Sequence, residues 1–110
     1  MATRKDTAAF ILSRLGHADR FSVYPMFGEF AVYADGKVVG LICDDQLFVK
    51  MMAESAVLEK CCEHAAPFPG AKDYYLVPEN VIAEERSLPD LLLRMAAKLP
   101  YPKAKKPKRG

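Results

Sequence analysis

An Asp-Gly pair at Asp35-Gly36 limits the folds open to this chain more than any other feature of the sequence. The flanking residues 30–34 and 37–43 are rich in β-branched, aromatic and other apolar side chains. Asp-Gly supplies the positive φ angles of a type I′ turn, whose twist suits two antiparallel strands. The pair therefore predicts a β-hairpin at this point of the chain.

A second reversal at Asp44-Asp45, in a tight turn or a slightly longer loop, leads to another β-rich run over residues 46–50. It extends the hairpin to a three-stranded antiparallel meander. Residues 21–27 predict one more strand before the meander. Pro25 has no N–H to donate to a ladder, so this strand is expected at a sheet edge or to end there.

Helical spacing of apolar residues predicts three helices, over residues 3–15, 53–65 and 87–99. Thr3 suits the cap of the first helix and Gly16 its left-handed end. The third helix is preceded by a capping Ser87. Its apolar stripe consists of Leu88, Leu91, Leu92, Met95 and Leu99, and Pro100 ends it.

Between the last two helices, residues 72–77 predict a strand ended by Pro78, and residues 79–82 a short helical turn. The order of elements predicts an α+β fold with two layers, in which helices pack on an antiparallel β-meander sheet. The 110 residues fit one domain, expected over residues 1–102.

Residues 103–110 differ from the rest of the chain. They contain lysine, arginine and proline but few groups that could pack, which predicts a disordered tail. Five of the 16 basic residues lie there, which leaves 11 basic against 14 acidic residues, about −3, on the body. Nucleic-acid binding, weak and non-specific, is therefore expected only through the tail cations: Lys103, Lys105, Lys106, Lys108 and Arg109.

Apolar runs in the sequence fall short of the ~18 residues that span a bilayer, and no signal-peptide core follows the N-terminus. The three cysteines have no disulfide-framework or zinc-ligand spacing. We therefore expect a cytoplasmic protein without membrane contact, metal or other cofactor. Cys61 and Cys62 are interpreted as thiols on the second helix, where burial is the usual role of cysteine.

Residues that could carry catalysis are few. Asp44-Asp45 is interpreted as a turn, and His17 and His64 as residues near helix ends. Neither histidine has a nucleophile with a recognisable orienting acid, and no phosphate-binding loop motif is present. The sequence predicts a protein that is not an enzyme. An unrecognised enzyme stays open as an alternative, which a histidine beside a carboxylate in a pocket would favour.

Met26-Phe27-Gly28 is the most distinctive string of the chain. Gly28 indicates a bulge or turn before the meander. Met26 and Phe27 are interpreted as core or bend-packing residues. The alternative is an interaction site, since one large apolar side chain held at a surface can dominate binding energy.

This string and several others resemble the N-terminal domain of the TfoX/Sxy family, without the second, helical domain of full-length members. Glu29 and Ala31 stand where the family often has glycine. The matching segments cover roughly residues 15–99, and are Met26-Phe27-Gly28, Val32-Tyr33, Asp35-Gly36-Lys37, Leu47-Phe48-Val49-Lys50 and Tyr75-Leu76-Val77-Pro78-Glu79, with the leucine-rich helix after them.

The resemblance implies an α+β fold similar to small secretion-chaperone-like domains, without enzymatic activity. Because the family includes regulators of bacterial competence, it also implies an interaction module that acts through protein contacts, related to competence or transcription. Neither the protein partner nor the role can be named from the sequence. A homodimer across a sheet edge or a helix face is a further hypothesis, since edge strands must be covered or blocked.

Overall fold

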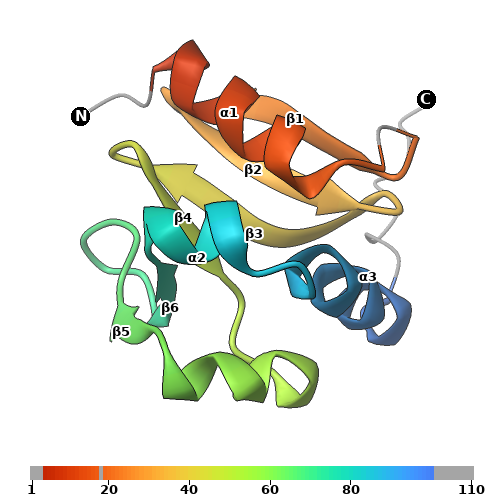
Figure 1. The fold of residues 1–110 in the computed structure, drawn as a ribbon. Coiled ribbons are helices and arrows are strands. Elements are labelled where there is room, and N and C mark those ends of the chain that lie inside the picture. The colour runs from red at the N-terminus through yellow and green to blue at the C-terminus, as the bar shows by residue number, and fades with distance from the viewer. Residues whose placement is uncertain (1–3, 18, 101–110) are drawn as a thin grey trace, which may run out of the picture.

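The computed structural model describes residues 4–17 and 19–100. The predicted cap at Thr3 and the predicted basic tail over residues 103–110 lie outside this part of the chain. The elements, shown in Figure 1, are α1 (Lys5–Leu15), β1 (Phe21–Met26), β2 (Glu29–Ala34), β3 (Lys37–Cys43), β4 (Gln46–Val49), the 3₁₀ helix η1 (Ala53–Lys60), β5 (Glu63–Ala65), β6 (Tyr74–Val77), α2 (Glu79–Glu84) and α3 (Leu88–Lys98).

The strands form one antiparallel sheet of six strands in the order β1-β2-β3-β4-β6-β5. This confirms the predicted α+β class. The meander has four strands rather than three, because β1 joins β2 through a turn of only two residues. Pro25 lies in β1, opposite Phe30 of β2, and β1 is an edge strand, as its proline predicts.

All three turns of the meander contain two residues, and every one of these residues has a positive φ angle. The φ angles are 52° and 82° at Phe27-Gly28, 51° and 82° at Asp35-Gly36, and 53° and 62° at Asp44-Asp45. This is the pattern of type I′ turns. The longer loop considered for Asp44-Asp45 is therefore not formed.

Strand β3 contains a bulge. Val32 of β2 lies opposite Gly40, whereas the next residue, Tyr33, lies opposite Val38, so Val39 has no partner of its own on β2. An extra residue on one strand increases the local twist. Gly40 also lies very close to β4, because a Cβ atom built on it would clash with the carbonyl oxygen of Phe48.

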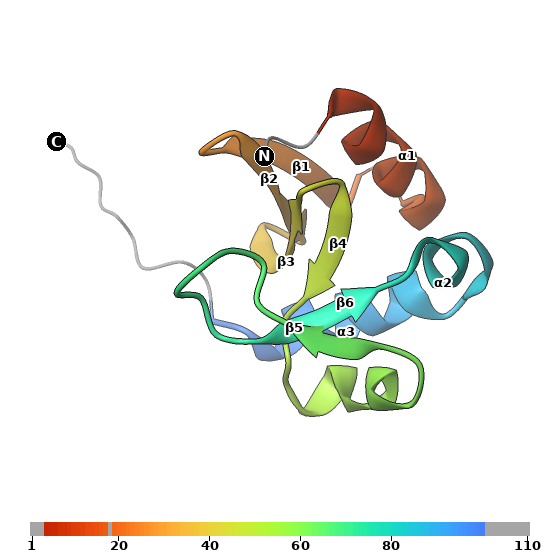
Figure 2. The same cartoon turned by 90° about the vertical axis from the view of Figure 1, so that its left-hand side faces the viewer.

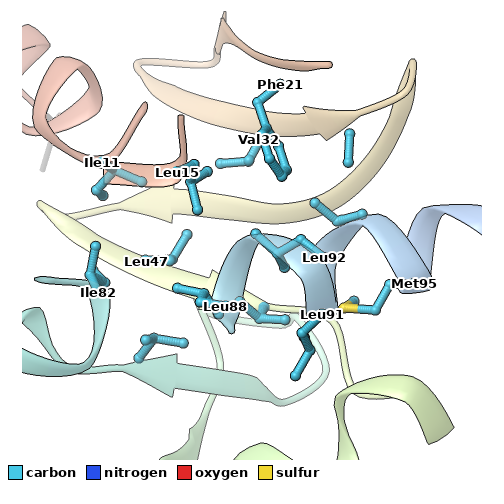
Figure 3. Packing of buried hydrophobic residues seen from close by; sticks show 14 of the residues in the cluster. Ile11, Leu15, Phe21, Val32, Leu47, Ile82, Leu88, Leu91, Leu92 and Met95 are labelled. Atoms are coloured by element: carbon cyan, nitrogen blue, oxygen red, sulfur yellow. The ribbon is translucent and has the colours of Figure 1, made fainter. Parts of the chain in front are cut away.

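The three α-helices pack against one side of the sheet, which lies to the right in Figure 2. They bury apolar residues against the inward-facing positions of the strands. Figure 3 shows this core, with Ile11 and Leu15 from α1, Ile82 from α2, Leu88, Leu91, Leu92 and Met95 from α3, and Phe21, Val32 and Leu47 from the sheet. The predicted stripe of α3 is thus confirmed as far as Met95, while Leu99 is half-buried.

The helix predicted over residues 53–65 is wrong in its second half. The 3₁₀ helix η1 ends at Lys60, and residues 63–65 form strand β5 instead. The amides of Cys61 and Cys62 both donate to the carbonyl oxygen of Leu58, at 3.0 and 2.8 Å, which turns the chain toward β6. Pairing with β6 then satisfies backbone groups that a longer helix would have used.

Two serines lie at the starts of helices, and the cap predicted at Ser87 is not formed through its side chain. Ser55 lies inside the first turn of η1, completely buried, where its hydroxyl donates to the carbonyl of Lys50 and accepts the amide of Met52. Ser87 precedes α3, but its hydroxyl donates to the carboxylate of Glu85 rather than accepting an amide of the helix. Within the described residues, none of the helices is long and apolar enough to cross a membrane.

Candidate functional site

The turns β1–β2 and β3–β4 lie at the same end of the sheet, to the left in Figure 1. A hydrogen bond joins them, in which the amide of Asp44 donates to Oε1 of Glu29 at 3.1 Å. The turn β2–β3 lies at the opposite end, where Arg20 donates to both carboxylate oxygens of Asp35, at 2.9 and 2.7 Å. The two ends are thus held by different polar contacts.

Asp45, in the β3–β4 turn, connects its end of the sheet to the start of helix α1. Its Oδ1 accepts the amide of Arg4 at 2.9 Å and the hydroxyl of Thr7 at 2.7 Å. These two bonds hold the pKa of Asp45 below its ordinary value. The carboxylate therefore acts as an N-terminal cap supplied from a distant turn, and the prediction that Asp44-Asp45 is structural is confirmed for Asp45.

Replacing Asp45 by asparagine is expected to lower the melting temperature at neutral pH. Because the folded-state pKa of Asp45 is depressed, its stabilising contribution exists above the ordinary value of about 3.9 and is lost as pH falls through the folded-state value. The melting temperatures of the wild type and Asp45→Asn should therefore converge in acid. Asp44→Asn in the same turn is the control, and an equal gap at neutral and acidic pH would contradict this role.

Phe27 projects from the β1–β2 turn with 97% of its surface exposed. The prediction that it belongs to the core is therefore wrong. The reason is its position: the first residue of a two-residue turn points away from both strands, whatever its type. The equivalent positions of the other two turns are Asp35 and Asp44, residues that tolerate a positive φ angle well.

Tyrosines of the β1–β2 hairpin line the sheet face that the α-helices do not cover. Tyr24 is 58% exposed and meets the ring of Tyr33 edge-on, with 5.4 Å between the ring centres and a 79° interplanar angle. Met26 is half-buried and packs against the apolar cluster of the same face. We call Tyr24, Met26, Phe27 and Tyr33 the hairpin patch. Gly28 contributes only its backbone, in a left-handed conformation with open space around it.

The apolar cluster beneath the patch has Ala31, Leu41, Cys43 and Phe48 as its buried members. It forms without a covering α-helix, as Figure 2 shows. The curved sheet and the surrounding half-buried side chains shield it instead. Met26 and Tyr33 of the hairpin patch therefore rest on packed side chains, whereas Phe27 projects into solvent.

A cleft of about 720 Å³ opens beside the same end, between α1, the start of β4, the end of β6 and the start of α2. Its apolar wall includes Phe10, Ile11 and Leu76, and Cys61 lies in its lining. Four acidic side chains and one arginine also line it: Asp6, Asp45, Glu63, Glu79 and Arg4.

The two histidines lie apart from these features. His17 is exposed, at the turn after α1, and its carbonyl oxygen accepts the amides of Arg20 and Phe21. His64 lies on β5, not on a helix, and its Nε2 is 2.9 Å from Oε1 of Glu59, which also accepts the hydroxyl of Tyr75. Neither histidine lines the cleft. Among the described residues, no three His, Cys, Asp or Glu side chains converge as metal ligands.

Known proteins similar to this chain identify the family to which it belongs. Residues 13–98 match the family model of the TfoX N-terminal domain. The chain is also 42% identical, over 108 residues, to a protein of Spirochaeta aurantia described as an uncharacterized 12.7 kDa protein in the trpE 5′ region. That match covers 98% of this chain and 93% of the relative. The resemblance seen in the Met26-Phe27-Gly28 string and the later motifs is thus confirmed, and the chain belongs to the TfoX N-terminal domain family.

Proposed function

We propose that this domain is a non-enzymatic interaction module that binds a protein partner through the hairpin patch, with Phe27 as the anchor. The observation that carries the proposal is the exposure of Phe27, 97%, at a turn position where the fold does not use its side chain. Family membership supports a regulatory type of domain in general. A role in competence or transcription is part of the proposal.

A phenylalanine at this position is unfavourable for the isolated domain. Its φ angle of 52° lies in the left-handed region, which costs an ordinary residue about 1–2 kcal/mol. Its ring remains in water, so it gains nothing from burial. Local rules that a natural sequence breaks without structural compensation are expected at functional sites.

The neighbouring side chains suit a binding surface. Aromatic residues and methionine are enriched at the centres of protein interfaces, and a few aromatic anchors carry most of the binding energy. Tyr24 is held by its edge-on contact with Tyr33, so less side-chain entropy is lost when a partner binds.

Phe27→Asn separates binding from folding. Asparagine suits a type I′ turn, so we expect the free energy of unfolding to stay the same or rise by up to ~1 kcal/mol. Loss of the anchor should weaken partner binding by ~2 kcal/mol or more, about 30-fold. The measurements are thermal melting and quantitative pull-down from the native cell extract with mass spectrometry, followed by titration of the partner so identified.

Phe68→Asn is the matched control, because Phe68 is also an exposed phenylalanine but lies in the loop between β5 and β6. The proposal predicts that this variant retains the proteins that Phe27→Asn loses. An unchanged set of bound proteins with Phe27→Asn would refute the role of Phe27. A turnover abolished by a change at His17, His64 or Asp44, in a variant that still folds, would make the protein an enzyme.

A further inference from the structure

Cys61 and Cys62 bring two thiols together at the turn between η1 and β5. Their Sγ atoms are 3.5 Å apart. Because both amides donate to the carbonyl oxygen of Leu58, the turn between η1 and β5 is fixed at both residues. The convergence of the thiols therefore comes from a hydrogen-bonded turn and not from an unconstrained segment.

The two thiols differ in their surroundings. Cys61 is exposed and lines the cleft beside α1, whereas Cys62 is buried and packs in the core under the helices. Burial, together with the contact to Cys61, raises the pKa of Cys62 to about 12. Cys62 is therefore a protonated thiol at neutral pH, and an incoming reagent reaches Cys61 first. All three cysteines are free, and Cys43 lies on the other face of the sheet.

The number of donors limits what this pair can hold. A structural zinc ion takes four ligands, almost always including more than two side chains from cysteine or histidine. In the part of the chain that the structure describes, no third His, Cys, Asp or Glu completes such a set around the pair. A ligand bound by Cys61 and Cys62 must therefore be one that needs only two sulfur atoms from the protein.

We propose that Cys61 and Cys62 form a dithiol site for trivalent arsenicals that carry one carbon substituent. Such a compound has two positions for sulfur, and its third bond is to carbon. Two S–H bonds break and two As–S bonds form, while the arsenic-bound oxygen leaves with both protons as water. Arsenic stays trivalent, so the step needs no oxidant or reductant.

The cleft beside α1 can accommodate the carbon substituent of the arsenic atom. Cys61 opens onto it, and its wall includes the side chains of Phe10, Ile11 and Leu76. Apolar surface removed from water there adds to the two covalent bonds. An aromatic substituent therefore suits the site, and phenylarsine oxide is the probe of choice.

The test is intact mass spectrometry of the reduced protein titrated with phenylarsine oxide under anaerobic conditions. We expect one equivalent per chain, with a mass gain equal to the probe less one water. Reversal is expected with a dithiol such as dimercaptopropanol and not with a monothiol at the same concentration. The second As–S bond is intramolecular, so Cys61→Ser should weaken binding by about 10²–10⁴-fold.

Cys43→Ser is the control and should bind as the wild type does. Cys62→Ser should match Cys61→Ser, and melting curves show whether each variant is folded. Because Cys61 is exposed, Cys61→Ser decides the question even if the buried substitution unfolds the domain. Tight binding that survives Cys61→Ser, or no binding by the folded wild type, would overturn the assignment.

Discussion

Replacing Leu92 by alanine is expected to lower the free energy of unfolding by about 2–5 kcal/mol. Leu92 is 1% exposed, in the middle of the α3 stripe, where it packs into the core between helix and sheet (Figure 3). Truncation removes buried methyl groups and leaves a cavity that the rigid sheet cannot fill. Denaturant unfolding followed by circular dichroism measures the change.

Leu93→Ala is the matched control for this substitution. Leu93 has the same side chain on the same helix but is only half-buried, so its truncation should cost clearly less. If Leu92→Ala changed stability by less than about half a kcal/mol, Leu92 would lie at the surface, and the register of α3 would be different.

Gly40→Ala is expected to destabilise the domain by ~3 kcal/mol or more, through the backbone rather than the core. The added Cβ would clash with the carbonyl oxygen of Phe48 and lie 3.4 Å from its carbonyl carbon, on the neighbouring strand. Because both atoms belong to the backbone, a rotamer change cannot relieve the contact. The β3–β4 pairing would have to shift, and melting temperature and amide exchange in these strands would report it.

Gly70→Ala separates this contact from the general effect of changing glycine. A Cβ at Gly70 meets nothing within 4 Å, although its φ angle of 89° is unfavourable for alanine. We expect a smaller loss there, of about 1–2 kcal/mol. Equal losses at the two positions would show that the close approach at Gly40 does not limit stability.

The parts of the fold that the sequence predicts well are those with local causes. Helix α3 has its apolar stripe and a following proline, and the Asp35-Gly36 turn has the residues that its φ angles need. The turn at Phe27-Gly28 is harder to predict from the sequence, because phenylalanine has no preference for turns. The spacing contained a signal nevertheless, since two β-rich runs are separated there by two residues ending in glycine, as at Asp35-Gly36.

Strand β5 could not be predicted from its own residues. Its three residues have no alternating apolar pattern, and it forms because β6, about ten residues later, offers a partner. This error also hid the dithiol. Neighbouring residues on a helix do not face each other, so a helix over residues 53–65 would separate the thiols of Cys61 and Cys62.

The sequence singles out Met26-Phe27-Gly28 as a candidate site, but it predicts a buried environment for Phe27, which is exposed. Residue type alone favours burial for Phe27, because large apolar side chains are usually inside. Whether the side chain of Phe27 points inward depends on where the turn begins. The capping of α1 by Asp45 is likewise invisible in the sequence, since the two groups are about 40 residues apart.

Pro25 at the outer edge of the sheet determines how another molecule can approach this domain. In a two-residue hairpin the residues beside the turn, Met26 and Glu29, form a hydrogen-bonded pair. Bonded and non-bonded pairs alternate, so the backbone groups of Phe21, Val23 and Pro25 point outward.

These outward positions of β1 offer few donors. Proline has no N–H, and the amide of Phe21 donates to the carbonyl oxygen of His17 at 3.1 Å. Among the outward positions of β1, only Val23 thus has an amide that a strand added at this edge could use. A regular series of backbone donors is not formed there. Extension of the sheet at the β1 edge, by a foreign strand or by a second copy placed edge to edge, is therefore disfavoured by the backbone. A molecule that docks at this edge must recognise side chains.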